Sequence, residues 1–230
     1  MREARIFLGA IVGNGERLRS DASAPLYADL RADAYGHGAP EVARALSAAG
    51  WRHLLLSAAA DAERLAPLMG ADAVLRFSDE AGVLSHTGPA LYGLESDAAS
   101  LGLASCMRVS ARVVSVKTVE AGEGVSYGHT YRLQRRSALA LVPVGYSDGL
   151  PRSAGNRGQV MLGGQPRPIA GRVAMDVHML DLGTDGAEVG DEAVLFGDLG
   201  VTAEDFASSF DVSGVELTTG IGPRVARTYA

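Results

Sequence analysis

The sequence predicts an α/β domain over residues 1–105 followed by a β-rich domain over residues 106–230. In the first part, short apolar runs alternate with segments of helical periodicity, which is the pattern of strands joined by helices. In the second part, nearly every apolar run reads as a strand, and the glycine pair at 163–164 indicates a tight hairpin. The two parts therefore differ in fold class.

The α/β part shows strand and helix signals in turn. Apolar runs predict four strands, at residues 24–32, 52–58, 71–79 and 88–94. A helix is predicted over 40–50, because Pro40 suits a first helical turn and Gly50 suits a helix end. A second helix is predicted over 61–70, where Pro67 favours an early end to the regular turns.

The β-rich part reads as strand after strand. Strands are predicted within four segments, 108–119, 137–147, 159–182 and 192–197. Near the end of the chain, residues 202–210 predict a short helix that Thr202 caps, with acidic residues in its first turn.

Composition excludes several classes of partner. The chain has 230 residues, of which 47% are apolar and 21% charged, which is typical of globular domains. A formal net charge of -6 argues against a nucleic-acid-binding face, and no run approaches the roughly 20 apolar residues of a membrane span. The single cysteine, Cys106, excludes an internal disulfide and a cysteine metal cluster. We therefore expect a cytoplasmic protein with no metal, nucleic-acid or membrane partner.

Seven motifs occur in an order that is informative together. They are ADAYGHGA at 32–39, LYGL at 91–94, VSYGHTY at 125–131, VPVGYSDGLPR at 142–152, PIAGRVAMD at 168–176, VGDEAVLFG at 189–197 and GPRVAR at 222–227. The set resembles the alanine racemase family, fold-type III enzymes that use pyridoxal phosphate (PLP). The resemblance implies a (β/α) barrel followed by a β domain. It also implies a homodimer in which each site combines one chain's barrel with its partner's β domain.

The residue before the ADAYGHG turn departs from that family. The resemblance implies a lysine there that forms the Schiff base with PLP, but this chain has Arg31. A guanidinium, with a pKa above about 12, cannot lose its proton and attack an aldehyde. The only lysine, Lys117, falls in a predicted strand of the β domain. We therefore expect a divergent member without racemase activity.

Three interpretations of the function remain open at this stage. Arg31 can pair bidentately with a phosphate or carboxylate, which favours a small-anion-binding or regulatory homodimer. The alternative is an active PLP-dependent alanine or amino-acid racemase, or a related enzyme, that holds PLP non-covalently or uses Arg31 and Tyr127 in a different reaction. A purely structural dimer without a ligand is the third possibility.

The resemblance implies cofactor contacts at four positions. Tyr35 matches the tyrosine that hydrogen-bonds the PLP phosphate, although a packed tyrosine with a satisfied hydroxyl would look the same. His86 takes the place of the arginine that contacts the pyridine nitrogen, so an always-charged donor becomes a titratable one. Gly88 and Pro89 stand where backbone NH groups hold the phosphate, but proline has no NH.

Three further positions are implied to act on the substrate from the β domain. Tyr127 matches the tyrosine that serves as the second base from the partner subunit. Because Arg31 replaces the lysine that would be the other base, only one of the two bases that racemisation requires would remain. Tyr146 matches the tyrosine at the active-site entrance, and Met175 matches the residue whose backbone NH meets the substrate carboxylate. For the last two, simple burial at a strand end is an equally good interpretation.

The α/β part is short for a barrel. A closed (β/α) barrel takes about 250 residues, and only about a hundred precede the β domain, so we predict a truncated, incomplete barrel. The missing stretch falls between Gly70 and Gly88. Open edges would expose apolar strand residues, at Leu30, Leu55, Leu75 and Leu91. We therefore expect an obligate homodimer.

Overall fold

The computed structural model describes residues 1–20, 22–197 and 200–230. The chain forms two compact units. The α/β unit comprises Ile6–Met107 with Tyr229–Ala230, and the β unit comprises Met1–Arg5 with Arg108–Thr228. The first five residues, which we expected within an α/β domain of residues 1–105, thus lie in the β unit. None of the helices in the described ranges is both long and apolar enough to cross a membrane.

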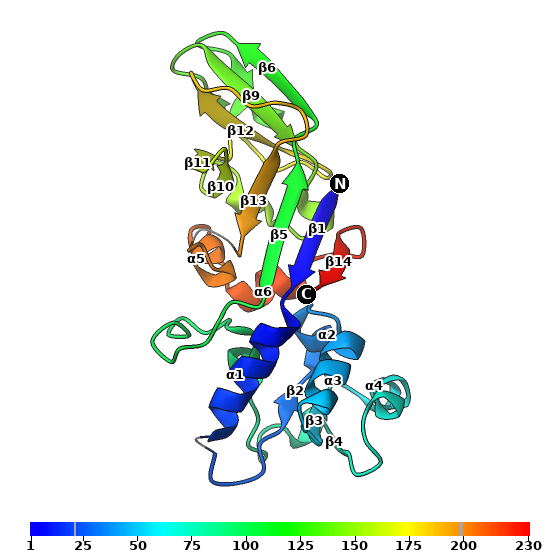
Figure 1. The fold of residues 1–230 in the computed structure, drawn as a ribbon. Coiled ribbons are helices and arrows are strands. Elements are labelled where there is room, and N and C mark those ends of the chain that lie inside the picture. The colour runs from blue at the N-terminus through cyan, green and yellow to red at the C-terminus, as the bar shows by residue number, and fades with distance from the viewer. Residues whose placement is uncertain (21, 198–199) are drawn as a thin grey trace. The chain divides into compact units, whose positions relative to one another are not determined.

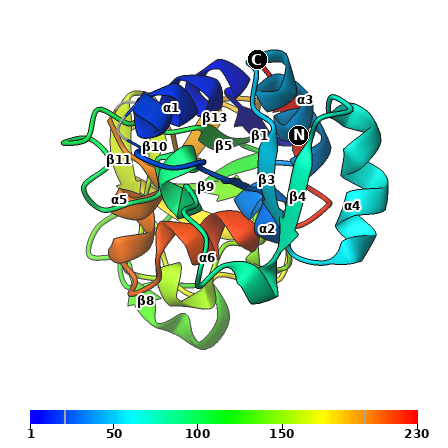
Figure 2. The ribbon, with the colours of Figure 1, turned by 90° about the horizontal axis from the view of Figure 1, so that it is seen from below.

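A parallel sheet organises the α/β unit. Its strand order is β2 (Ala28–Asp29), β3 (His53–Leu56) and β4 (Val74–Phe77), and the last two run side by side in Figure 2. An isolated parallel bridge joins Tyr27 to His86 beyond β2. Because β2 ends at Asp29, the chain passes from the sheet almost directly into the turn that carries Arg31.

Helices and short 3-10 turns surround this sheet. They are α1 (Leu8–Ser20), α2 (Arg31–Tyr35), α3 (Ala39–Ala48), α4 (Ala59–Leu65), η1 (Ala66–Leu68), η2 (Ser78–Glu80) and η3 (Gly88–Tyr92). Helix α3 packs against α1 and α4. Its predicted position is confirmed, with Pro40 in its first turn and Gly50 beyond its end at a φ of 83°. The expected early end of the second predicted helix is also confirmed, because α4 stops at Leu65, before Pro67.

One prediction for this unit needs correction, and one helix was not predicted. Residues 88–94 do not form a strand, because Gly88 has a φ of 57°, Pro89 lacks an NH, and the segment winds into η3. The sequence also gave no sign of helix α1, whose glycines weaken its helical pattern. Gly15 has a packing reason: a Cβ there would lie 2.9 Å from the Trp51 ring.

The apolar residues that we expected to be exposed at open strand edges are largely covered within one chain. Leu30 is 3% exposed, and Leu55 and Leu91 are fully buried. Leu75 is half-buried. Exposed strand leucines therefore give little support to an obligate dimer.

Two sheets and a small ribbon build the β unit (Figure 1). The six-stranded sheet has the order β11-β10-β13-β5-β1-β14, with β11 (Gln165–Pro168), β10 (Gln159–Leu162), β13 (Glu192–Phe196), β5 (Met107–Arg112), β1 (Arg2–Ile6) and β14 (Ala226–Tyr229). The three-stranded antiparallel sheet is β12 (His178–Gly183), β9 (Ser137–Val142) and β6 (Ser115–Val119). The ribbon pairs β7 (Gly124–Val125) with β8 (Tyr131–Arg132).

Short helices complete this unit. They are η4 (Tyr127–His129), η5 (Tyr146–Asp148), η6 (Arg152–Ala154), α5 (Ala203–Ser208) and α6 (Gly214–Thr219). Two predictions are confirmed: Gly163 and Gly164 close the β10–β11 hairpin with φ values of 63° and 73°, and the Thr202 hydroxyl accepts a hydrogen bond from Asp205 N at 3.0 Å.

The segment 108–119, where we predicted strand structure, holds two strands, because the chain changes sheets in its middle. Val113 N donates to Asp191 O at 2.9 Å, whereas Val114 N donates to Leu141 O at 3.0 Å. Strand β5 therefore pairs with β13 in the large sheet, and β6 pairs with β9 in the small one.

Candidate functional site

The turn after strand β2 places Arg31 against a buried carboxylate. The Asp29 side chain is fully buried at the end of β2. Arg31 Nε donates to Asp29 Oδ1 at 2.9 Å, and a terminal guanidinium nitrogen donates to Oδ2 at 2.5 Å. The Asp29 carboxylate also raises the pKa of Arg31 further above its ordinary value. Arg31 is thus a permanent cation that is already paired.

Left-handed backbone fixes this arrangement. Ala32, Asp33, Ala34 and Tyr35 have φ values of 51°, 54°, 56° and 54°. Such a conformation costs about 1–2 kcal/mol for each L-residue, so neighbouring contacts must hold it. One such contact is the Asp33 carboxylate, which accepts a hydrogen bond from Ala39 N at 2.9 Å. The turn brings the Tyr35 side chain back over Asp29.

Polar side chains surround the Asp29 carboxylate, and we call Asp29, Arg31, Tyr35 and His86 the Asp29 cluster. The Tyr35 hydroxyl donates to Asp29 Oδ2 at 3.0 Å, and His86 Nδ1 lies 3.4 Å from the same oxygen. Burial, and then the negative charge of Asp29, raise the pKa of Tyr35 to about 12. The backbone is held as well, because Tyr92 donates its hydroxyl to Asp29 O at 2.7 Å.

This cluster does not fit covalently bound PLP. Attachment needs an amine that can become neutral, and the α/β unit contributes Arg31 where the family resemblance implies a lysine. Tyr35, which the resemblance assigns to the phosphate, donates its hydroxyl to a carboxylate instead. That carboxylate would repel a phosphate dianion. Gly88 is buried and precedes Pro89, which has no NH to offer an anion.

The β unit brings together the three residues assigned to it. Tyr127, Tyr146 and Met175 line one pocket of about 380 Å³, together with Arg152 and Arg172. Their exposed fractions are 72%, 44% and 51%, so burial at a strand end does not explain Tyr146 or Met175. The Arg152 guanidinium carbon lies 5.8 Å from the centre of the Tyr146 ring. Two cations beside two phenols suit a small anion.

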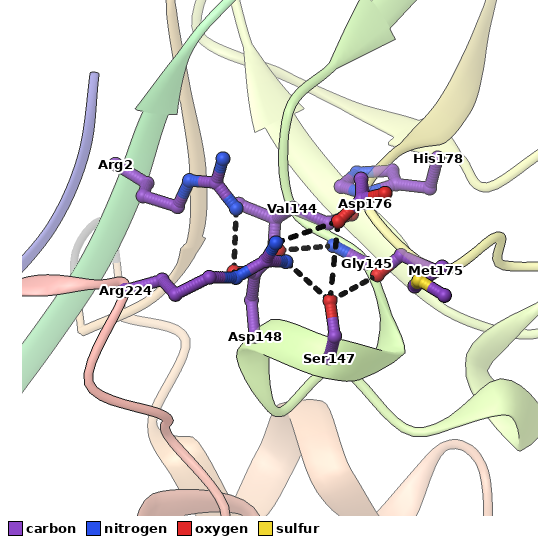
Figure 3. A network of polar contacts seen from close by, with 9 residues as sticks. All are labelled: Arg2, Val144, Gly145, Ser147, Asp148, Met175, Asp176, His178 and Arg224. Carbon is purple, nitrogen blue, oxygen red and sulfur yellow. Dashed lines mark hydrogen bonds and ion pairs between the residues drawn. The ribbon is translucent and has the colours of Figure 1, made fainter.

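A second buried carboxylate holds the turn that carries Tyr146. Asp148 is fully buried and accepts a hydrogen bond from Gly145 N at 2.9 Å. Its Oδ1 pairs with Arg2 at 2.5 Å and with Arg224 at 2.9 Å (Figure 3). These two arginines come from opposite ends of the sequence.

Arg224 joins that turn to the loop that carries Met175. Its guanidinium pairs with Asp176 at 2.7 Å, lowers the pKa of Asp176, and donates to the Ser147 hydroxyl. The Ser147 hydroxyl donates in turn to Met175 O at 2.6 Å, as Figure 3 shows. Gly145 packs so closely that a Cβ would lie 2.2 Å from Met175 O. The network therefore fixes two walls of the pocket.

Lys117 lines a different concavity of the β unit. This hollow of about 420 Å³ lies over the β6 and β9 strands and is mostly apolar, with Val119, Leu139 and Leu141 in its wall. Tyr127 lines it as well as the arginine pocket. Within the described residues, no group of three or more His, Cys, Asp or Glu side chains is placed to hold a metal.

Sequence reasoning missed four residues of these sites. Asp29 is an acid inside a predicted strand, and a buried acid requires a partner, so its position carried a usable signal. Asp148 lies in the polar turn GYSDG, where an acid is ordinary, so its burial could not be predicted. Arg152 and Arg172 lie within the motifs GYSDGLPR and PIAGRVAMD. Their convergence on one pocket depends on folding and could not be read from spacing.

Comparison with curated proteins gives one family. The alanine racemase of Salinispora arenicola is 49% identical over 151 residues, which are 64% of this chain and 41% of the relative. That of Streptomyces coelicolor is 40% identical over 210 residues, which are 86% of this chain and 52% of the relative. The chain thus spans about half the length of the curated relatives it matches.

Solved structures confirm an alanine racemase fold, with a barrel-like N-terminal domain and a C-terminal β domain. The alanine racemase of a D-cycloserine-producing Streptomyces lavendulae superposes with a TM-score of 0.89 at 28% identity, covering 100% of this chain and 97% of that chain. The Bartonella henselae enzyme, solved with covalently bound pyridoxal phosphate, gives 0.91 at 20% identity, with 100% and 99% covered.

Family models agree with these matches over both parts of the chain. The model of the alanine racemase N-terminal domain matches residues 6–91. The model of the C-terminal domain matches residues 106–229, more than half of the sequence. On this evidence the chain belongs to the alanine racemase family.

Proposed function

We propose that this chain is an alanine racemase family member without racemase activity that binds a small anion through its β unit. One observation carries the proposal: the residue at the lysine position is Arg31, and its guanidinium is clamped by the buried Asp29. A racemase needs an acid–base group on each face of the reacting carbon. Tyr127 supplies one such group, and Arg31 cannot supply the other.

The anion is proposed to bind at Arg152 and Arg172 rather than at Arg31. Arg31 already donates to a carboxylate through two of its nitrogens, so much of its charge is neutralised. Arg152 and Arg172 line a pocket of about 380 Å³ with Tyr127 and Tyr146, which is large enough to admit phosphate or a small carboxylate. Guanidinium groups bind such anions through two parallel hydrogen bonds.

A truncated barrel is the second part of the proposal. The parallel sheet over the described residues has three strands, and the bridge at His86 follows β4 after a short segment. The chain also spans about half the length of its curated relatives. Both facts support the loss of middle barrel strands between Gly70 and Gly88, together with any cofactor contacts that those strands would bear.

The proposals of a homodimer and of a cytoplasmic location rest on one observation each. Tyr127, Tyr146 and Met175 are exposed in the single chain, which supports a homodimer in which the partner subunit covers this pocket. The lone cysteine, Cys106, supports a reducing, cytoplasmic compartment.

Two measurements on the purified protein test the proposal. Circular dichroism of L-alanine solutions with excess PLP should detect no racemisation, and turnover of about 1 per second or faster would refute the inactive assignment. Isothermal titration calorimetry with inorganic phosphate should give one site, which the double variant Arg152→Ala, Arg172→Ala should lose. Unchanged phosphate binding in that variant would refute the anion site.

A second candidate function is an active PLP-dependent enzyme, because Lys117 and Tyr127 line the same hollow of about 420 Å³. A lysine and a tyrosine facing one cavity are the residue types that PLP chemistry requires. Borohydride treatment with PLP followed by peptide mass analysis decides between the candidates. A stoichiometric pyridoxyl group on Lys117, lost in Lys117→Arg, would favour the enzyme; background labelling would favour the anion-binding protein.

A further inference from the structure

We infer that Asp29 and Arg31 form a coupled pair in which the buried carboxylate requires a permanent cation at position 31 and would capture any amine placed there. The inference concerns the α/β unit only. It stands whether or not the pocket of the β unit binds an anion, because it depends on no residue of that unit.

The surroundings of Asp29 leave Arg31 as its permanent counter-charge, because His86, whose Nδ1 lies 3.4 Å from Oδ2, is charged only when it is protonated. Asp29 is fully buried, and a buried carboxylate without a cation is strongly unfavourable. Tyr35 donates a hydrogen bond but remains neutral near pH 7, because its pKa is about 12. Tyr92 bonds the backbone oxygen of Asp29 and not the carboxylate. Arg31 makes three side-chain hydrogen bonds to the two carboxylate oxygens.

Position 31 is also held in place by the backbone. Arg31 N donates to Asp29 Oδ1 at 3.2 Å, and the left-handed residues that follow set the direction in which the chain leaves. A lysine side chain starting from the same Cα would therefore begin beside the carboxylate. Its ammonium would replace the guanidinium as the counter-charge of Asp29.

An amine held in this way is a poor nucleophile. A carboxylate within about 4–6 Å raises the pKa of an ammonium, and each unit lowers the neutral fraction tenfold at a given pH. Arg31→Lys by itself should therefore leave the amine protonated. Removing the charge of Asp29 in the same molecule should release it. The absence of a lysine at position 31 and the buried carboxylate of Asp29 are thus two separate obstacles to imine chemistry.

Competitive acetylation tests the capture of the amine. Acetic anhydride acylates a neutral amine and releases acetate and a proton, and Lys117 serves as an internal reference in every sample. In Arg31→Lys, acetylation at position 31 should be at least about tenfold slower than at Lys117. In Asp29→Asn, Arg31→Lys, the ratio should rise at least about tenfold. Equal ratios in the two variants would overturn the inference.

Thermal stability tests whether Asp29 requires the Arg31 cation, and this test introduces no lysine at position 31. Arg31→Gln leaves the buried Asp29 carboxylate without its permanent cation, with Tyr35 and His86 as its remaining side-chain neighbours, and should lower the Tm by more than about 4 °C. Adding Asp29→Asn should restore at least half of that loss. Arg157→Gln is the matched control, because its pair with Asp211 is exposed, and its Tm should hardly change. A loss in Arg31→Gln no larger than in this control would overturn the inference.

Discussion

Replacing Asp148 by alanine should destabilise the β unit more than any exposed ion-pair substitution. The side chain is fully buried, pairs with two arginines, and accepts the Gly145 NH. Breaking a buried ion pair costs about 3–5 kcal/mol. Arg2 and Arg224 are 24% and 44% exposed and can regain water, which reduces the cost. We expect a loss of about 2–4 kcal/mol in the free energy of unfolding.

Urea unfolding measures this loss. With a denaturant slope of about 2 kcal/mol/M, the midpoint should fall by about 1–2 M. Trp51, the only tryptophan, is buried in the α/β unit, so its fluorescence reports that unit, while far-UV circular dichroism reports both. The shift should therefore be larger by circular dichroism than by fluorescence. A shift no greater than that of Asp211→Ala, a carboxylate in an exposed pair, would refute the reasoning.

Three further outcomes are expected. Burial lowers the pKa of His178 to about 4, so the unfolded protein binds more protons than the folded protein between pH 4 and 6.5. The free energy of unfolding should therefore rise with pH by up to about 1.4 kcal/mol per pH unit over that window. Urea titrations at several pH values should show a flatter slope for His178→Asn. Gly145→Ala should weaken phosphate binding in calorimetry, because its Cβ would meet Met175 O at 2.2 Å; equal affinity would contradict the packing. Asp148→Asn keeps an acceptor for Gly145 N and should lose less stability than Asp148→Ala; equal losses would assign the whole effect to charge.

Local signals in the sequence were sufficient for several elements. Pro40 and Gly50 bounded helix α3, and Gly163 with Gly164 marked the hairpin, because these residues restrict the backbone where they stand. The change of sheet between Val113 and Val114 was not predictable, since two adjacent valines continue any strand.

The same distinction applies to the sites. Tyr127, Tyr146 and Met175 could be found because they lie in short motifs, and the fold brings them to one pocket. The pairs that hold the sites are nonlocal or depend on burial: Arg2 reaches Asp148 across 146 positions of sequence. No pattern of spacing encodes such a contact.

The division of the chain also determines the order in which the β unit can be completed. Strand β1 lies between β5 and β14 in the large sheet, so the first and last strands of the sequence are neighbours. Strand β1 is synthesised before its sheet partner β5, and about a hundred residues of the other unit separate the two strands in the sequence. Such long-range pairing slows folding. A fragment that began at Arg108 would lack both an interior strand of the large sheet and the Arg2 counter-ion of Asp148, so we expect it to be less stable than the β unit of the whole chain.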